Sequence, residues 1–114
     1  MPICVALFFI LLLFILMEVI IKKSKNKNKK FDAVVDNKTV SFGAKGYSDY
    51  TIHKDAERKQ RYINRHKEKE NWTLSGIKTA GFYAKHILWN KPTLTASIND
   101  LNKKYKSIKV KLKT

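Results

Sequence analysis

The sequence predicts an α+β protein built from a single N-terminal transmembrane helix, a basic linker and one small domain. Three observations predict this: a long apolar run at the start, a lysine-rich stretch directly after it, and strand-like and helix-like patterns over residues 31–114. The chain has 114 residues, so the apolar run leaves room for one small domain. We expect about three helices there, with a short antiparallel sheet or hairpin.

Residues 3–21 read ICVALFFILLLFILMEVII, with Glu18 as their only charged side chain. A helix over this run would be about 28 Å long, close to the roughly 30 Å hydrocarbon core of a bilayer. A cleaved signal peptide has a basic leader, which is missing here, and a buried core helix is rarely apolar on every face. Residues 1–21 are therefore expected to form a transmembrane anchor, with Glu18 near the headgroups.

Residues 22–30, KKSKNKNKK, are low in complexity and typical of an extended or disordered linker. Because no charged side chain precedes the apolar run, the positive-inside rule places the N-terminus in the lumen and the C-terminal domain in the cytosol. The glycosylation sequons at Asn37 and Asn71 should then carry no sugar. The linker lysines either act as a topology signal alone or also lie on an anionic membrane surface. They are Lys22, Lys23, Lys25, Lys27, Lys29 and Lys30.

The stretch FDAVVDNKTVSF predicts a hairpin, with strands near 31–35 and 39–42 around Asp36 and Asn37. Gly43 and Gly46 mark the loop that follows. A phosphate-binding loop is one interpretation of these glycines, but the Walker spacing is absent. The end of the chain alternates apolar and lysine residues over 108–113, which predicts a strand that either completes this sheet or pairs with a partner.

Three helices are expected between these strands. The first covers about 55–70 and is strongly basic, which suits either a solvated face or contact with a nucleic-acid backbone. The second runs from Thr73 or Ser75 to about Trp89, with apolar residues at helical spacing. The third is amphipathic, with apolar residues at 94, 98, 101 and 105, and it is capped by Thr93 or Thr95.

The aromatic residues of the central block exceed what one small core needs, and arginine and tryptophan are enriched among dominant interface residues. We therefore expect a partner-binding surface there, although both tryptophans also fit a core. The expected surface comprises Arg58, Arg61, Arg65, Trp72, Phe82 and Trp89.

Catalytic patterns are missing from the sequence. His53, His66 and His86 lack metalloprotease spacing, and no serine or cysteine lies in a nucleophile motif. His53 and Asp55 could in principle hold a metal, but ordinary polar or core roles fit the histidines better. Cys4 is the only cysteine, so no disulfide framework is possible. We expect a protein that is not an enzyme and has no cofactor and no metal.

Four segments, FGAKGYSDYT, HKDAERKQRYINRH, ENW and GIKTAGFYAKHILWNKPTL, resemble a family of short, essentially uncharacterised proteins of large nucleocytoplasmic DNA viruses. The resemblance covers about half of the chain and implies a viral context without an activity. Joined to the topology, it suggests a minor capsid protein that links the internal viral membrane to capsid proteins and lies between them in the virion. The alternative is a membrane-tethered nucleic-acid-binding protein, since the net charge is +15.

Overall fold

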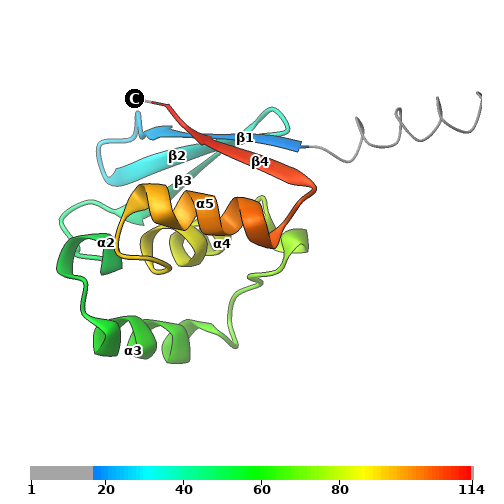
Figure 1. The fold of residues 1–114 in the computed structure, drawn as a ribbon. Helices are drawn as coiled ribbons and strands as arrows, with labels where there is room; N and C mark the ends of the chain where they lie inside the picture. Colours follow the sequence, from blue (N-terminus) through cyan, green and yellow to red (C-terminus); the bar gives the residue numbers. More distant parts are fainter. Residues whose placement is uncertain (1–16, 114) are drawn as a thin grey trace, which may run out of the picture.

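The computed structural model describes residues 17–113, which form a four-stranded sheet with helices packed against one face (Figure 1). The strand order is β3-β2-β1-β4, with β1 antiparallel to β2 and parallel to β4. The sheet is therefore mixed, and the molecule is α+β. The strands are β1 (Met17–Lys23), β2 (Lys29–Val35), β3 (Lys38–Ala44) and β4 (Ile108–Leu112).

The predicted transmembrane helix is wrong for the residues that the structure describes. Residues 17–21, expected as the end of the span, form most of β1, and no helix within residues 17–113 is long and apolar enough to cross a membrane. Val19 and Ile21 are fully buried, whereas Glu18 and Lys22 lie on the other face, so this segment follows the two-residue period of a strand. In the sequence, this segment continues a long apolar run, so the two-residue period was not recognised. Residues 1–16 of the expected span lie outside the described residues.

The predicted basic linker is also wrong, because residues 22–30 belong to the sheet. They form the end of β1, a turn and the start of β2. Asp32 fixes the turn: its Oδ1 accepts hydrogen bonds from Ser24 Oγ and Ser41 Oγ, both at 2.6 Å, and its Oδ2 accepts one from the Lys25 N–H. Burial raises the pKa of Asp32, but these hydrogen bonds outweigh it and hold the pKa below its usual value.

The β2–β3 hairpin turns at Asp36 and Asn37, as the sequence predicts. Both residues have positive φ, 48° and 63°, which is the backbone that a two-residue hairpin loop requires. Lys78 Nζ lies 2.8 Å from Asp36 Oδ2 and ties the turn to the helical layer. The prediction of a short antiparallel sheet was wrong in one respect. The strand β1 lies between this hairpin and β4 and runs parallel to β4, so the sheet is mixed.

Two helical segments cover one face of the sheet and complete the core (Figure 1). The first is α4 (Ala80–Tyr83), continued by the π-helical turn η2 (Ala84–Leu88), and the second is α5 (Leu94–Lys104). Phe82, Tyr83 and Ile87 from the first segment are fully buried, and Leu101 from α5 is fully buried as well. The helical elements are α2 (Tyr50–His53), α3 (Ala56–His66), the 3-10 turn η1 (Leu74–Gly76), α4 (Ala80–Tyr83), η2 (Ala84–Leu88) and α5 (Leu94–Lys104).

The buried histidine His86 links η2 to the loop before η1. Its Nε2 lies 2.8 Å from the carbonyl oxygen of Trp72, and its ring packs between Phe82 and Tyr105. Burial lowers the pKa of His86 to about 4, although the bond to the Trp72 carbonyl opposes this. The side chain is therefore neutral at pH 7 and belongs to the core.

Candidate functional site

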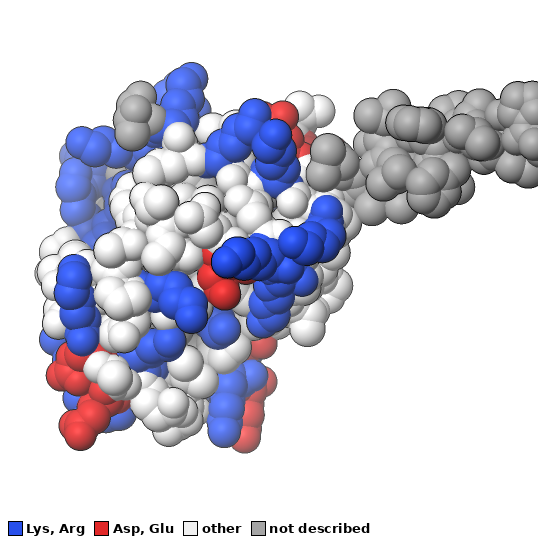
Figure 2. All heavy atoms as spheres, in the orientation of Figure 1, with Lys and Arg blue, Asp and Glu red and all other residues white. Residues whose placement is uncertain are grey.

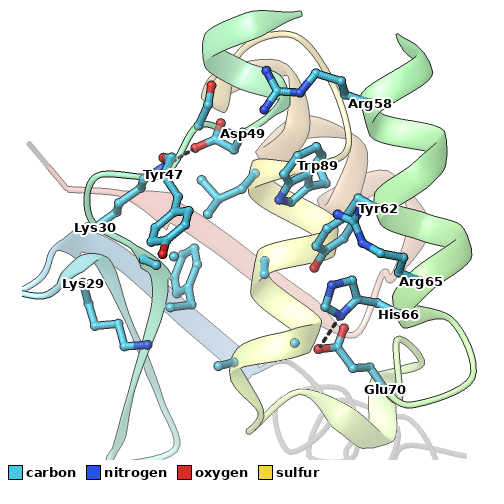
Figure 3. A pocket seen from close by; sticks show the side chains of 18 residues that line it. Lys29, Lys30, Tyr47, Asp49, Arg58, Tyr62, Arg65, His66, Glu70 and Trp89 are labelled. Atoms are coloured by element: carbon cyan, nitrogen blue, oxygen red, sulfur yellow. Dashed lines mark hydrogen bonds and ion pairs between the residues drawn. The ribbon is translucent and has the colours of Figure 1, made fainter. Parts of the chain in front are cut away.

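A cleft of about 490 Å³ separates α3 from the end of the sheet. Figure 3 shows its two walls: Arg58, Tyr62, Arg65 and His66 project from α3, and Lys30, Tyr47 and Asp49 face them, with Trp89 between. The last residues of β3 and the exposed side of α4 and η2 complete the lining. Among the helices of residues 17–113, α3 lies farthest from the sheet (Figure 1).

The floor of the cleft is formed by small residues of the α4–η2 segment. Ala80, Gly81 and Ala84 line it, together with Leu88. A Cβ atom at Gly81 would lie 2.8 Å from the Glu70 carboxyl carbon, so glycine leaves room for the Glu70 carboxylate beside the helix. The π-helical geometry of η2 adds one residue to the turn below this floor, a distortion that is often found at functional sites.

A column of aromatic rings holds α3 in place. Tyr62 is the only buried residue of this helix, and its ring stacks on Trp89 with centroids 4.4 Å apart and planes 2° apart. His66 stacks on Tyr62 at 4.4 Å, and His53 packs against Trp89 at 5.3 Å. Lys59 Nζ adds a hydrogen bond to the carbonyl oxygen of Asn90 at 2.6 Å. The helix is thus attached along a narrow contact, and most of its surface is exposed.

All three arginines of the chain lie on α3. Arg58 and Arg65 are seven residues apart, so they share a helix face, and both line the cleft. Arg61 is exposed on the same helix but does not line the cleft. Within the described part of the chain, no carboxylate forms an ion pair with any of the three.

The opposite wall carries an ion pair that is already satisfied. Lys30 Nζ lies 2.7 Å from Asp49 Oδ2 and also donates to the Tyr47 carbonyl oxygen. Asp49 is 1% exposed and caps α2 by accepting from the Thr51 N–H. Lys30 therefore organises the loop after β3 rather than offering a free charge. Lys29, on the same wall, forms no ion pair among residues 17–113.

The expected partner-binding residues are only partly brought together. Arg58, Arg65 and Trp89 line the cleft, whereas Phe82 is fully buried in the core and offers no surface to a partner. Trp72 is half-buried outside the cleft, where its Nε1 donates to Glu70 Oε2 at 3.1 Å. Its indole ring packs under Lys85 Nζ, 5.7 Å from the ring centre. The prediction of a surface role for Phe82 is therefore wrong.

The six lysines expected on a membrane surface are distributed around one end of the sheet. Lys25 and Lys27 lie in the β1–β2 turn, and Lys22 and Lys23 end β1. Lys29 and Lys30 begin β2 and line the cleft. Figure 2 shows that lysine and arginine side chains outnumber acidic ones over the visible face, so positive charge is not confined to these six.

The cleft is equipped to bind an anion. Two guanidinium groups and the Lys29 ammonium group face a space with two acidic side chains. Asp49 is paired with Lys30, and Glu70 lies 3.5 Å from His66 Nδ1 and accepts a hydrogen bond from Trp72 Nε1. Guanidinium groups bind carboxylates and phosphates with two parallel hydrogen bonds. Within residues 17–113, no group of three or more His, Cys, Asp or Glu side chains could hold a metal. His53 lies in the aromatic column, where burial lowers its pKa.

Comparison with known proteins adds one match. Residues 19–66 match the model of a family of unknown function, DUF5754. The matched stretch runs from β1 to the end of α3, so it contains Lys29, Arg58 and Arg65 but not Trp89. No curated protein and no solved structure matches the chain.

The cleft itself escaped the sequence analysis. Lys29 and Tyr47 enter it from loops and strand ends that are distant in sequence from α3, and no spacing rule connects them. One signal was available: the arginines occur only between positions 58 and 65, where they flank Tyr62. A clustering of all arginines around one aromatic residue marks a helix with a specialised surface.

Proposed function

We propose that the protein is a non-enzymatic docking module that binds an acidic partner in the cleft between α3 and the sheet. The observation that carries the proposal is the set of three arginines on α3, which have no carboxylate partner in the described residues. Arg58 and Arg65 project toward a space already lined by Lys29. Unpaired arginines on one side of a cleft are the arrangement that recognises carboxylates or phosphates.

The overall charge supports an acidic partner. The chain has 24 Lys and Arg residues against 9 Asp and Glu residues, and only Lys30, Lys78 and Lys111 form ion pairs with carboxylates in the described residues. The unpaired charges repel one another in the free protein, and a partner of opposite charge relieves this repulsion. The same field accelerates encounter with that partner, in a way that weakens as salt increases.

The partner that we propose is an acidic surface of a capsid protein in the particle of a large DNA virus. The viral resemblance of the central block supports this choice, since that block supplies α3 and most of the cleft. A protein partner also suits the mixed lining, because Leu88 and the Tyr62–Trp89 stack offer apolar contact beside the arginines. The domain then acts as a minor capsid component that docks on a shell protein through this cleft.

Occupancy of the protein in purified particles tests this proposal. Changing all three arginines to glutamine should leave the domain folded and strongly reduce its occupancy after nuclease treatment. The matched control changes Lys103, Lys106 and Lys109 to glutamine, which removes the same charge away from the cleft. Equal occupancy of the two variants would show that only net charge matters, and wild-type occupancy of the arginine variant would show that α3 is a solvated face.

Nucleic acid is the second candidate, and Tyr47 is the observation that favours it. This ring is 74% exposed at the rim of the cleft, near Lys29, where a base can stack on it. Salt-dependent, sub-micromolar binding of the full chain to DNA, lost on changing Tyr47 to alanine, would favour this function. Loss of the protein from particles on nuclease treatment would point the same way.

A further inference from the structure

The two edge strands of the sheet, β4 and β3, differ in whether their outward backbone groups are hydrogen-bonded. At the β4 edge, Asn102 of α5 pairs with the backbone of Val110: its Nδ2 donates to the Val110 carbonyl at 3.0 Å, and its Oδ1 accepts from the Val110 N–H at 2.7 Å. The amide side chain thus occupies the positions that a neighbouring strand would use. Lys109 and Lys111 add charge on the open face of this strand. The β4 edge is closed to a further strand.

The β3 edge has no such cover. Val35 pairs with Lys38 across the two-residue turn, and Val40 pairs with Ala33. In an antiparallel pair of strands, only every second residue directs its N–H and carbonyl toward the partner strand. Thr39 and Ser41 therefore direct their backbone groups away from β2. Among residues 17–113, no side chain or backbone group bonds to the N–H or the carbonyl of either residue outside the sheet. Thr39 is exposed, and its side chain carries no charge that would repel a strand.

The open edge leads into the basic cleft. Phe42, Gly43 and Ala44, which end β3, all line the cleft, and Arg58 and Arg65 stand across it on α3 (Figure 3). An added strand lies about 4.8 Å from β3, with alternate side chains on opposite faces of the sheet. A segment paired with Thr39 and Ser41 can therefore continue beside Gly43 and place its acidic side chains opposite the arginines.

We infer that the acidic partner binds as an extended segment that adds a fifth strand to the β3 edge, with its acidic side chains in the cleft. This inference rests on the proposed function and specifies its binding mode. Backbone pairing with Thr39 and Ser41 supplies affinity, and the charges of Arg58 and Arg65 select an acidic sequence. A second copy of this chain is a poor occupant of the same edge, because each copy carries a net charge of +15.

The test measures binding of a short, blocked peptide of alternating glutamate and valine to the full chain in non-ionic detergent. Thr39→Pro removes the outward N–H and is compatible with an edge strand, whereas Thr39→Ala keeps the N–H and is the matched control. We expect Thr39→Pro to weaken binding by about tenfold relative to Thr39→Ala, as the loss of one backbone hydrogen bond predicts. The second arm leaves the protein unchanged and uses the same peptide N-methylated at every residue, which has no backbone N–H to donate on either edge and should bind at least about tenfold more weakly.

Each outcome decides between the alternatives. Equal binding of the parent and methylated peptides overturns strand addition, and this arm holds even if Thr39→Pro fails to fold. Loss of binding in Arg58→Gln/Arg65→Gln, with no effect of proline or methylation, keeps the docking function and rejects the strand. Full binding by that arginine variant rejects the docking function itself. A dimer of the full chain that Thr39→Pro dissociates would make a second copy the occupant and overturn the inference.

Discussion

The α4–η2 segment and α3 are attached to the domain in opposite ways. The first places Phe82, Tyr83, Ile87 and Leu88 against the sheet, all of them buried. The second buries Tyr62 alone and is held by a stack of rings and a hydrogen bond from Lys59 to the Asn90 carbonyl. The sequence of α4–η2 is therefore constrained by the core, whereas α3 is free to carry an exposed set of arginines. The binding surface that we propose therefore lies on a helix that contributes little to the core.

Replacing Phe82 tests the core side of this comparison and should have the largest effect. Phe82→Ala should lower the free energy of unfolding by about 3 to 5 kcal/mol, because a fully buried ring leaves a cavity in the core. Denaturant unfolding followed by circular dichroism measures this, with Phe82→Leu as a milder control. A loss below about 1 kcal/mol would mean that the ring is not packed in the core.

Acidification should reveal the buried histidine of η2. The folded-state pKa of His86 is about 4, below the usual 6.5, so the unfolded chain binds more protons between these values. The stability that His86 contributes is complete above about pH 6.5 and is lost as the pH falls toward 4, by about 3 kcal/mol. Unfolding free energies measured across this range should fall less steeply for His86→Gln. Parallel curves for the two proteins would contradict a neutral, buried His86.

Removing the Tyr62 ring should release α3 without unfolding the core. Tyr62→Ala is expected to cost about 1 to 3 kcal/mol, since it removes a buried ring that stacks on both Trp89 and His66. Hydrogen exchange should accelerate in α3 and stay slow in α5, whereas Tyr62→Phe should preserve slow exchange in both. Equal acceleration in the two helices would show that α3 belongs to the cooperative core.

The arginines of α3 should have the smallest effect on stability. Arg58→Ala, Arg61→Ala and Arg65→Ala should each change the free energy of unfolding by less than about 0.5 kcal/mol, because all three side chains are exposed and none pairs with a carboxylate of residues 17–113. Thermal unfolding of the single and triple variants checks this. A cooperative loss in the triple variant would reveal a structural role that the ion pairs of the folded protein do not show.

Local sequence patterns predicted the elements whose conformation depends on neighbouring residues in the sequence. The Asp36–Asn37 turn, the lysine-alternating last strand and the apolar spacing of α5 all correspond to elements of the structure. The prediction failed where a local pattern fits two structures. Residues 17–21 end an apolar run, which suggested a helix, but they form a strand with alternating burial. Pairing with β2 and β4, distant in sequence, decides between them.

The candidate site was predictable only in part, for the same reason. The arginines and Trp89 were identified as residue types that are enriched at interfaces. Phe82 was chosen as one of the surplus aromatic residues, yet it lies in the core. The cleft depends on how far α3 lies from the sheet, which is a property of the loops before and after it. No periodicity in the sequence encodes that distance.

Hydrogen exchange of the full chain with and without poly-glutamate, at about 0.15 M salt, tests the central claim most directly. Poly-glutamate carries only carboxylate side chains, so the arrangement of basic side chains on the protein decides where it binds. We expect exchange to slow in α3 and β3 and to stay unchanged in the β1–β2 turn with Lys25 and Lys27, which is also basic but lines no part of the cleft. Protection centred on that turn, or spread evenly over all basic segments, would contradict a binding site in the cleft.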